Sequence, residues 1–358
     1  MEVLAALPER LLPWFRDNHR DLPWRQDRTP YHVWLSEIML QQTRVEAVKG
    51  YYTRFLWQLP SISALADAEE ALLYKLWEGL GYYSRVRNLQ KAARIIVSDY
   101  GGVFPREYSQ VRALPGIGDY TAGAICSICF DEKTPAVDGN VLRVVTRLTD
   151  NHGCTDDRRV KLQISAQLAE IYPAEAGTFT QALMELGATV CLPNGAPKCQ
   201  ACPMGDLCQA RKQGTIDSLP VRAEKKPRKQ EDMTVFLLTC GDRLALRQRP
   251  DSGLLAGLYE LPHLPGTMTP EAIISAAEQW DLQPEYLEKL VHRTHIFTHI
   301  QWNMTGARLH CGAEGGGSCL TEEGREFVRR YQALQRDVEE AAEKLFQKHF
   351  GDQEELDD

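Results

Sequence analysis

The sequence lacks the long hydrophobic runs with which a protein enters or crosses a membrane. No apolar stretch in its 358 residues approaches the ~20 that a membrane-spanning helix needs. The first residues, Met1-Glu2-Val3-Leu4, have neither the basic start nor the long apolar core of a secretory signal peptide. We therefore expect a protein without a signal peptide and without a membrane partner.

An excess of positive charge is also lacking, because 41 Lys and Arg residues stand against 49 Asp and Glu residues, a formal net charge of −8. This total alone argues against a nucleic-acid partner. The charge is uneven, however: residues 211–229 hold seven basic and two acidic residues, whereas residues 350–358 hold five acidic residues and no basic one. A local basic surface can bind phosphate while a distant acidic tail sets the total. A nucleic-acid partner therefore stays open.

The first part of the chain is predicted to be nearly all helical. Residues 1–210 carry apolar side chains at helical spacing. A single long helix is expected from about Tyr31 to Phe55, while Leu22–Arg25 is expected in a loop. Further helices are expected at residues 72–77, 86–96, 120–128, 141–148, 162–170 and 180–190. A length of 358 residues allows two domains or more.

The second part has a different composition. Residues 211–230 are polar, basic and poor in helix formers, and are predicted to be a linker. Residues 231–350 are then predicted to form an α+β domain. Its expected elements are strands at 233–239 and 244–248, a helix at 270–279, an alternating half-buried strand from Thr294 to Met304, and a closing helix at 326–350. Residues 351–358 are expected to be an acidic, disordered tail.

Four of the ten cysteines form a cluster with the spacing C-x7-C-x2-C-x5-C: Cys191, Cys199, Cys202 and Cys208. The other six are scattered, which favours a reduced compartment and a metal site over a disulfide framework. Four thiolates can bind one zinc ion or a [4Fe–4S] cluster. Zinc ribbons usually have two C-x-x-C pairs and this chain has one, so the spacing favours iron and sulfur. No redox partner site is visible, which favours a structural role for the cluster.

Residues 114–124, with the sequence LPGIGDYTAGA, predict a hairpin between two helices that binds phosphate. Gly116 and Gly118 permit a close approach, and a helix begins behind them near Tyr120. Residues 137–141 then place one carboxylate, that of Asp138, at the start of another helix. This region therefore suggests that the backbone of the hairpin binds nucleic-acid phosphate next to a single carboxylate.

Two carboxylates are candidates for acid and base chemistry. Glu37 lies in the apolar helical run LSEIMLQQT, where such surroundings raise the pKa of a carboxyl group toward the value that a general acid needs. The pattern also fits an edge glutamate that reaches water. Asp138 also fits a plain helix N-cap. Alternatively, the two could form the pair of acid and stabiliser that cleavage of a glycosidic bond requires.

Together these motifs resemble the helix-hairpin-helix DNA glycosylases, and within them the adenine DNA glycosylases that act on adenine mispaired with 8-oxoguanine. The resemblance covers nearly the whole chain. It rests on LPWR (22–25), SEIMLQQT (36–43), WEGLGYYSR (77–85), residues 114–124 and 137–141, the four cysteines, and FTH (297–299). It implies a catalytic domain over residues 1–210 made of a six-helix-barrel module and an iron–sulfur module, followed by a Nudix-like domain. The cluster loop would span residues 191–208.

The resemblance implies catalytic roles for four residues. Glu37 would protonate the flipped adenine at N7, and Asp138 would stabilise the oxocarbenium-like sugar or trap it covalently. Tyr120 and Asn140 would hydrogen-bond around the reacting centre. In related glycosylase-lyases the position of Tyr120 is a lysine, whose amine forms a Schiff base and cuts the strand. Tyrosine cannot do this, so we predict a monofunctional glycosylase.

The resemblance also implies a base pocket and a DNA grip. The adenine pocket would be lined by Trp24, Arg25, Leu40 and Gln181. Gln42 and Tyr82 would wedge into the base stack as the adenine leaves it, because a base inside a duplex must be extruded before it can react. Gly116 and Gly118 would hold the phosphate backbone. The cofactor would be a [4Fe–4S] cluster bound by the four cysteines.

The Nudix-like domain lacks the acidic box that a pyrophosphatase of that fold needs, so we predict that it recognises DNA without hydrolysis. Oxidation turns guanine N7 into an N–H donor, which a protein must meet with an acceptor. Thr298 would provide it, Phe297 would press on the duplex, and His299 completes the motif. The alternation through these residues also fits plain strand positions. Two features depart from the family: Thr298 replaces the usual serine, and the first cysteine gap is seven residues instead of six.

The implied partner is double-stranded DNA that contains A·8-oxoG or A·G mispairs, bound by a monomer in the bacterial cytoplasm at the nucleoid. Three other functions are considered. A pyrimidine-damage glycosylase-lyase similar to endonuclease III is disfavoured by Tyr120 and by the second domain. A Nudix hydrolase is disfavoured by the missing acidic box. A non-catalytic iron–sulfur protein that binds DNA is the third.

Overall fold

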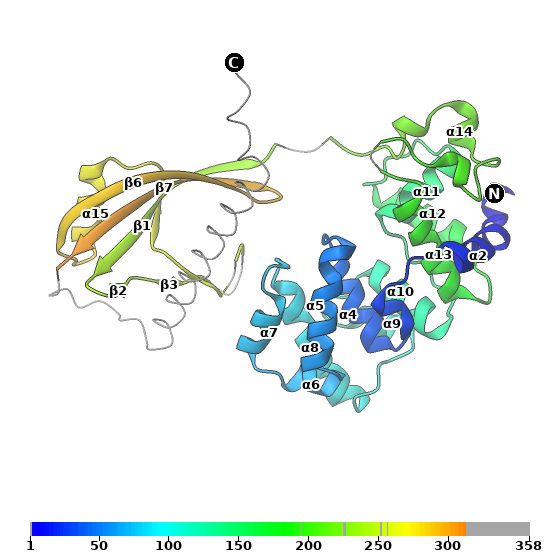
Figure 1. Ribbon diagram of the computed structural model, residues 1–358, viewed down its shortest axis with the longest axis horizontal. Coiled ribbons are helices and arrows are strands. Elements are labelled where there is room, and N and C mark those ends of the chain that lie inside the picture. The colour runs from blue at the N-terminus through cyan, green and yellow to red at the C-terminus, as the bar shows by residue number, and fades with distance from the viewer. Residues whose placement is uncertain (1, 194, 225–226, 251–252, 256, 313–358) are drawn as a thin grey trace, which may run out of the picture. The chain divides into compact units, whose positions relative to one another are not determined.

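A computed structural model describes residues 2–193, 195–224, 227–250, 253–255 and 257–312. The chain forms two compact units, Met1–Glu224 and Lys225–Asp358 (Figure 1). The first is helical and the second is built on a sheet, which confirms the predicted fold class. The closing helix predicted at 326–350 and the acidic tail lie outside the described residues. Within the described residues, no helix is long and apolar enough to span a bilayer.

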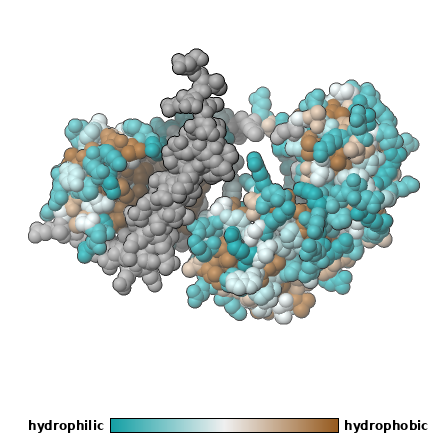
Figure 2. All heavy atoms as spheres, viewed as in Figure 1, coloured by the Kyte–Doolittle hydropathy of each residue, from teal (hydrophilic) through white to brown (hydrophobic). Residues whose placement is uncertain are grey.

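The first unit consists of short and medium helices joined by turns. In chain order they are α1 (Glu2–Ala5), α2 (Leu7–Asn18), α3 (Pro23–Gln26), α4 (Pro30–Leu40), α5 (Val45–Gln58), α6 (Ile62–Asp67), α7 (Glu70–Trp77), α8 (Ser84–Tyr100), α9 (Tyr108–Ala113), α10 (Asp119–Phe130), α11 (Gly139–Thr149), α12 (Arg158–Ala169), α13 (Ala176–Thr189) and α14 (Gln209–Gln213). Helix α3 occupies residues that were expected in a loop. On the face drawn in Figure 2, hydrophilic residues cover most of this unit.

These helices enclose two apolar cores. The first is built from residues 22–136 and contains Trp34, Phe55 and Trp77. The second joins α1 and α2 to helices α11, α13 and α14, so the start of the chain packs against its later half. Helix α10 contacts both α4 and α13, and it therefore connects the two cores. The boundary between the cores is where the candidate site lies.

The single helix predicted from Tyr31 to Phe55 is wrong. Helix α4 ends at Leu40, helix α5 begins at Val45, and Gln42 between them has a φ of +60°. The carbonyl oxygens of the last turn of α4 accept hydrogen bonds from the Arg85 guanidinium, where amides of a continuing helix would otherwise bind. A local pattern could not reveal this ending, because its cause lies far along the chain.

In its described residues, the second unit is a mixed sheet with one helix packed on it. Its elements are β1 (Lys229–Cys240), β2 (Arg243–Leu244), β3 (Arg247–Gln248), β4 (Tyr259–Glu260), β5 (His263–Pro265), α15 (Pro270–Gln279), β6 (Pro284–Ile296) and β7 (Ile300–Cys311). The sheet has the order β2-β1-β7-β6, with β5 also paired to β1, while β3 and β4 form a separate ribbon. Strands β1 and β7 are parallel, and β6 and β7 are antiparallel. Helix α15 packs on the sheet through Ile273 and Ala277.

The single strand predicted from Thr294 to Met304 is also wrong. Strand β6 ends at Ile296 and β7 begins at Ile300, so residues 297–299 form the turn of a hairpin. The Phe297 backbone N–H donates to the Ile300 carbonyl oxygen at 2.8 Å and closes this turn. A period of two continues through such a short turn, so the alternation did not show where the chain reverses.

The predicted end of the catalytic domain at residue 210, followed by a linker, stays a prediction. In the structure, Leu219 is buried in the second core of the helical unit, although it lies in the predicted linker 211–230. The Val221 carbonyl oxygen accepts the backbone N–H of Thr155 at 2.9 Å. The early part of the predicted linker is therefore packed on the helices.

Candidate active site

A cavity of about 370 Å³ lies between the two cores of the helical unit. Nine of the predicted site residues line it: Trp24, Arg25, Glu37, Leu40, Gln42, Tyr120, Asp138, Asn140 and Gln181. They come from α3, α4, the loop after α4, α10, the start of α11 and α13. The fold therefore brings together side chains that the sequence places on six separate segments.

Glu37 is buried on α4, with 7% of its surface exposed, and the hydroxyl of Tyr120 donates to its Oε2 at 2.5 Å. Burial raises the pKa of Glu37 from its ordinary 4.5 to about 7. The Tyr120 hydrogen bond opposes this rise, the charge of Asp138 adds to it, and Arg25 opposes it. A large fraction of the Glu37 carboxyl groups is therefore protonated at neutral pH, as a general acid requires. Its burial excludes the alternative of an edge glutamate in water.

Asp138 is held at the start of α11 by two separate hydrogen bonds. Its Oδ1 accepts the Val141 backbone N–H, and its Oδ2 accepts Nδ2 of Asn140, both at 2.7 Å. Arg143 in turn donates to Oδ1 of Asn140 at 2.9 Å, which fixes the orientation of the amide. Burial raises the pKa of Asp138, while its bonds to Val141 and Asn140 lower it. Asp138 therefore caps helix α11 and also lines the cavity. The two interpretations of Asp138 that the sequence left open are thus compatible.

Glu185 on α13 is a cavity residue that the sequence analysis missed. Its side chain is fully buried, and it accepts the backbone N–H of Arg20 at 3.0 Å, Nε of Arg20 at 2.7 Å and Nη2 of Arg25 at 2.7 Å. Burial alone would raise the pKa of Glu185, but the hydrogen bonds with Arg20 and Arg25 lower it to about 2. Glu185 therefore fixes Arg25 in the cavity wall. Its place one helical turn after Gln181 was the signal available in the sequence.

The predicted phosphate grip lies outside the cavity lining. Gly116 has a φ of +78°, and a Cβ there would lie 2.8 Å from the Cβ of Asn88, so a side chain is excluded. Ile117 is buried and anchors the turn, while Gly116 and Gly118 face solvent. The exposed turn is followed by the N-terminus of the twelve-residue helix α10, an arrangement suited to phosphate.

Tyr82 and the FTH motif also lie outside the cavity lining. Tyr82 precedes α8, and 49% of its surface is exposed. Phe297, Thr298 and His299 form the hairpin turn of the second unit. The Phe297 ring packs edge-on against the rings of His295 and Trp302, with centroids 4.4 and 4.8 Å away. The turn is therefore supported by aromatic contacts from both strands.

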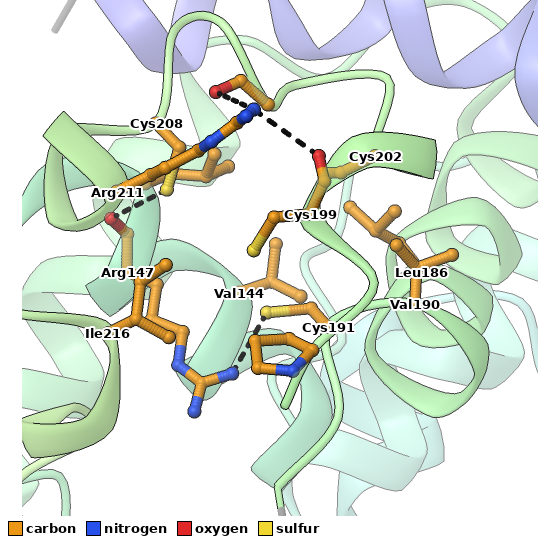
Figure 3. A pocket seen from close by; sticks show the side chains of 13 residues that line it. Val144, Arg147, Leu186, Val190, Cys191, Cys199, Cys202, Cys208, Arg211 and Ile216 are labelled. Carbon is orange, nitrogen blue, oxygen red and sulfur yellow. Dashed lines mark hydrogen bonds between the residues drawn. The ribbon is translucent and has the colours of Figure 1, made fainter. Parts of the chain in front are cut away.

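The four clustered cysteines surround a second, smaller cavity of about 30 Å³ (Figure 3). Apolar side chains complete its wall, among them Val144, Leu186 and Ile216. Among the described residues, no group of three or more His, Cys, Asp or Glu side chains is arranged to hold a metal ion. The four cysteines nevertheless line one common cavity, as the clustered spacing predicted.

A buried arginine supports a negatively charged group in this place. Arg147 is 5% exposed, and its Nη1 donates to the Sγ of Cys191 at 3.4 Å (Figure 3). Its Nε donates to the Leu219 carbonyl oxygen and its Nη1 also donates to that of Leu192, and in the described part of the chain it has no carboxylate partner. A buried guanidinium needs a compensating charge. Four thiolates bound to a metal centre carry net negative charge, so the residues present fit such a group.

Comparison with known proteins agrees with this geometry. The sequence pattern of the HhH-GPD superfamily base excision DNA repair proteins matches residues 35–170, and that of the NUDIX domain matches residues 234–348. An adenine DNA glycosylase of Mus musculus is 37% identical, over 83% of this chain and 69% of the relative. One of Buchnera aphidicola (subsp. Acyrthosiphon pisum) is 33% identical, over 81% of this chain and 82% of the relative. The chain belongs to the adenine DNA glycosylase family.

Solved structures support the same fold for the helical part of this family member. A thermostable thymine-DNA glycosylase aligns with a TM-score of 0.54 and 26% identity, over 59% of this chain and 98% of that one. An endonuclease III in a non-covalent complex with DNA aligns with a TM-score of 0.50 and 26% identity, over 58% of this chain and 94% of that one. These alignments place the chain among DNA glycosylases of the endonuclease III superfamily, which typically carry an iron–sulfur cluster.

The longer first cysteine gap of this adenine DNA glycosylase family member is accommodated in the loop after α13. The Lys198 backbone N–H donates to the Val190 carbonyl oxygen at 2.9 Å, which closes the loop just before Cys199. Nε of Arg143 donates to the Cys191 carbonyl oxygen at 2.7 Å and holds the other end. Both ends of the gap are therefore fixed, and the additional residue lies between them.

Proposed function

We propose that the chain removes adenine from A·8-oxoG and A·G mispairs in double-stranded DNA, as a monomeric and monofunctional glycosylase of base excision repair. One observation carries the proposal: a buried carboxyl group, Glu37, has a pKa of about 7 and shares a cavity with the fixed carboxylate of Asp138. These are the acid and the stabiliser that cleavage of an N-glycosidic bond needs. The adenine DNA glycosylase relatives support the choice of base.

The reaction begins with extrusion of the adenine into the cavity of about 370 Å³. Glu37 donates its proton to N7, so that the electron pair of the breaking N-glycosidic bond moves onto the leaving base. Positive charge develops on the sugar, and the Asp138 carboxylate stabilises it. Water then adds to the sugar carbon and gives its proton to the Glu37 carboxylate, which restores the acid.

The side chain at position 120 separates this chemistry from that of a lyase. A strand-cutting glycosylase needs an amine that forms a Schiff base with the sugar. Tyr120 offers a hydroxyl, and this hydroxyl donates to Glu37 at 2.5 Å. The group at this position therefore tunes the acid and forms no covalent bond with DNA.

Two features of the cavity and the hairpin turn would select the mispair. Gln181 and the Arg25 guanidinium, which Glu185 holds in place, offer polar contacts to a flipped base. A site built from such fixed polar groups discriminates strongly against bases that leave them unpaired. In the second unit, the hydroxyl of Thr298 would accept the N7–H of 8-oxoguanine, and Phe297 would press on the duplex. The contact between the Phe297 and Trp302 rings, which holds the turn in place, supports this role.

The four cysteines Cys191, Cys199, Cys202 and Cys208 would bind a [4Fe–4S] cluster. A bound cluster would cross-link the loop that carries these cysteines, and no step of the hydrolysis is assigned to it. Arg147 would compensate its negative charge through the bond to Cys191. Purified protein should therefore be brown, and a colourless protein that contains zinc would contradict this assignment.

The test uses three duplexes that contain A·8-oxoG, A·G or T·G. We expect adenine release from the first two only, with strands cut only after alkali. Glu37→Gln should abolish release while DNA binding persists. Release at the wild-type rate by Glu37→Gln would show that another group is the acid. An enzyme–DNA adduct trapped by borohydride would favour the lyase similar to endonuclease III instead.

A further inference from the structure

Arg85, the second residue of α8, lies between the two loops that carry Gln42 and Tyr82. Its guanidinium donates to five carbonyl oxygens in two groups. Nη1 binds those of Ile38, Met39 and Gln41 at 2.8, 3.2 and 2.7 Å, and Nη2 binds those of Leu80 and Gly81 at 2.7 and 3.2 Å. One side chain thus joins the end of α4 to the loop between α7 and α8.

The stability of α8 itself does not explain Arg85. A cation in the first turn of a helix opposes the helix dipole. Within the described part of the chain, Arg85 has no carboxylate partner, and its buried Nε binds nothing. Burial accordingly lowers the pKa of Arg85. The charge is stabilised by the carbonyl end of α4 and by the Trp77 ring, whose centroid lies 5.3 Å from the guanidinium carbon.

Both loops contain backbone conformations that side chains rarely adopt. Gln42 has a φ of +60° and Tyr82 a φ of +47°. Gly79 and Gly81, next to Tyr82, have φ values of +94° and +67°, and a Cβ on Gly79 would clash with the hydroxyl of Tyr51. Such conformations persist only where surrounding contacts hold them, and they gather at functional sites. Arg85 supplies contacts of this kind to both loops at once.

We propose that Arg85 is a positioning residue that holds Gln42 and Tyr82 as one two-part wedge, so that both enter the base stack together when the adenine leaves it. This rests on the proposed function, in which a base is extruded from the duplex. Extrusion of a base breaks its stacking at one point of the duplex, so side chains that replace it must be held in a fixed relation to each other. Arg85 does not line the cavity and its side chain hydrogen-bonds to neither Glu37 nor Asp138, so we expect its loss to affect extrusion more than bond cleavage.

The test compares two duplexes under single-turnover conditions with Arg85→Met, which keeps an apolar stem and removes the donors. The first duplex holds a fully stacked A·8-oxoG pair, and the second carries a tetrahydrofuran abasic analogue beside the same adenine. We expect a loss of about 100-fold in the rate of adenine release on the first duplex, as for a misplaced positioning group. On the second, where less stacking must be broken, the loss should be several times smaller. The pH dependence of the rate should be unchanged on both.

A fluorescent base reports extrusion directly. With 2-aminopurine beside the target adenine, binding by Glu37→Gln should raise the fluorescence as the adenine leaves the stack. Addition of Arg85→Met to Glu37→Gln should reduce this rise. Arg94→Met is the matched control, because Arg94 lies on the same helix and, among the described residues, donates only to the Ala66 carbonyl oxygen, at 3.0 Å. Its effect should be the same on both duplexes.

Arg85→Lys decides the question if Arg85→Met does not fold. Lysine keeps the charge but has three donors on one nitrogen, which cannot reach the carbonyl oxygens of both loops. It should show an intermediate loss that is again larger on the fully stacked duplex. Equal losses on the two duplexes, or no loss, would overturn the proposal. Failure of the proposed function is distinct, since wild-type protein would then release adenine from neither duplex.

Discussion

Glu37 should make the helical unit less stable as the pH rises, and Glu37→Gln should remove this dependence. The folded protein holds the Glu37 proton tightly, because burial raises the pKa from 4.5 to about 7. Stability from this group is therefore fully present below pH 4.5 and is lost as the pH rises through 7. Glutamine fills the same space, keeps an acceptor for the Tyr120 hydroxyl and never ionises. The variant should thus gain stability relative to wild type as the pH increases.

The magnitude follows from the pKa shift. Each pKa unit corresponds to about 1.36 kcal/mol, so the rise from 4.5 to about 7 gives about 3 kcal/mol over the full range. Part of this is already lost at pH 5, which leaves about 2–3 kcal/mol between pH 5 and pH 8. For a unit of this size, each kcal/mol shifts the melting temperature by about 2–4 °C. The gain of Glu37→Gln should therefore be about 5–10 °C larger at pH 8 than at pH 5.

Circular dichroism of wild type and Glu37→Gln at the two pH values measures this difference. Glu107→Gln is the control, because it removes a charge from an exposed carboxyl group of the same unit. Its melting temperature difference from wild type should be equal at both pH values. If the difference for Glu37→Gln is also equal at both, the carboxyl group does not carry the raised pKa, and the assignment of the acid loses its support.

Three further predictions concern the groups around the two carboxylates and the hairpin turn. Tyr120→Phe removes a hydrogen bond that lowers the Glu37 pKa, so the pH at which the rate of adenine release halves should move up by about one unit. Gly187→Ala places a Cβ 2.5 Å from that of Asn140, so the rate should fall with DNA affinity retained, whereas Gly50→Ala, with open space around it, should be neutral. Thr298→Ala should lower the preference for A·8-oxoG over A·G, measured as a ratio of single-turnover rates.

The order of helical and sheet-containing parts was predictable because it depends on local composition. Apolar periodicity, and the loss of helical spacing after residue 230, can be recognised from residues that are close together in the sequence. The environment of Glu37 was also predictable, because its apolar neighbours lie one helical turn away on the same helix. The expected rise of its pKa is present in the structure.

Other features depend on contacts between distant residues and could not be predicted in this way. At the break after Leu40, the carbonyl oxygens are bound by Arg85, which lies on another helix. The role of Glu185 depends on Arg20 and Arg25 from the start of the chain, and the sequence around α13 alone does not reveal these partners. The turn at residues 297–299 continues the alternation of its flanking strands, so the alternation could not show where the chain reverses.

The distance between Glu37 and Asp138 is set by how closely the two cores of the helical unit pack. Gly177 on α13 approaches α10 so closely that a Cβ would lie 2.8 Å from the Ser127 carbonyl oxygen, and the Thr180 hydroxyl donates to that of Ser127 at 2.8 Å. This contact fixes α13 against α10, whose Tyr120 binds Glu37, and α13 also packs against α11, which Asp138 caps. Cleavage of a glycosidic bond needs its two carboxylates at a defined separation. The small and polar residues between the helices therefore serve the reaction although none of them touches the cavity's two acids.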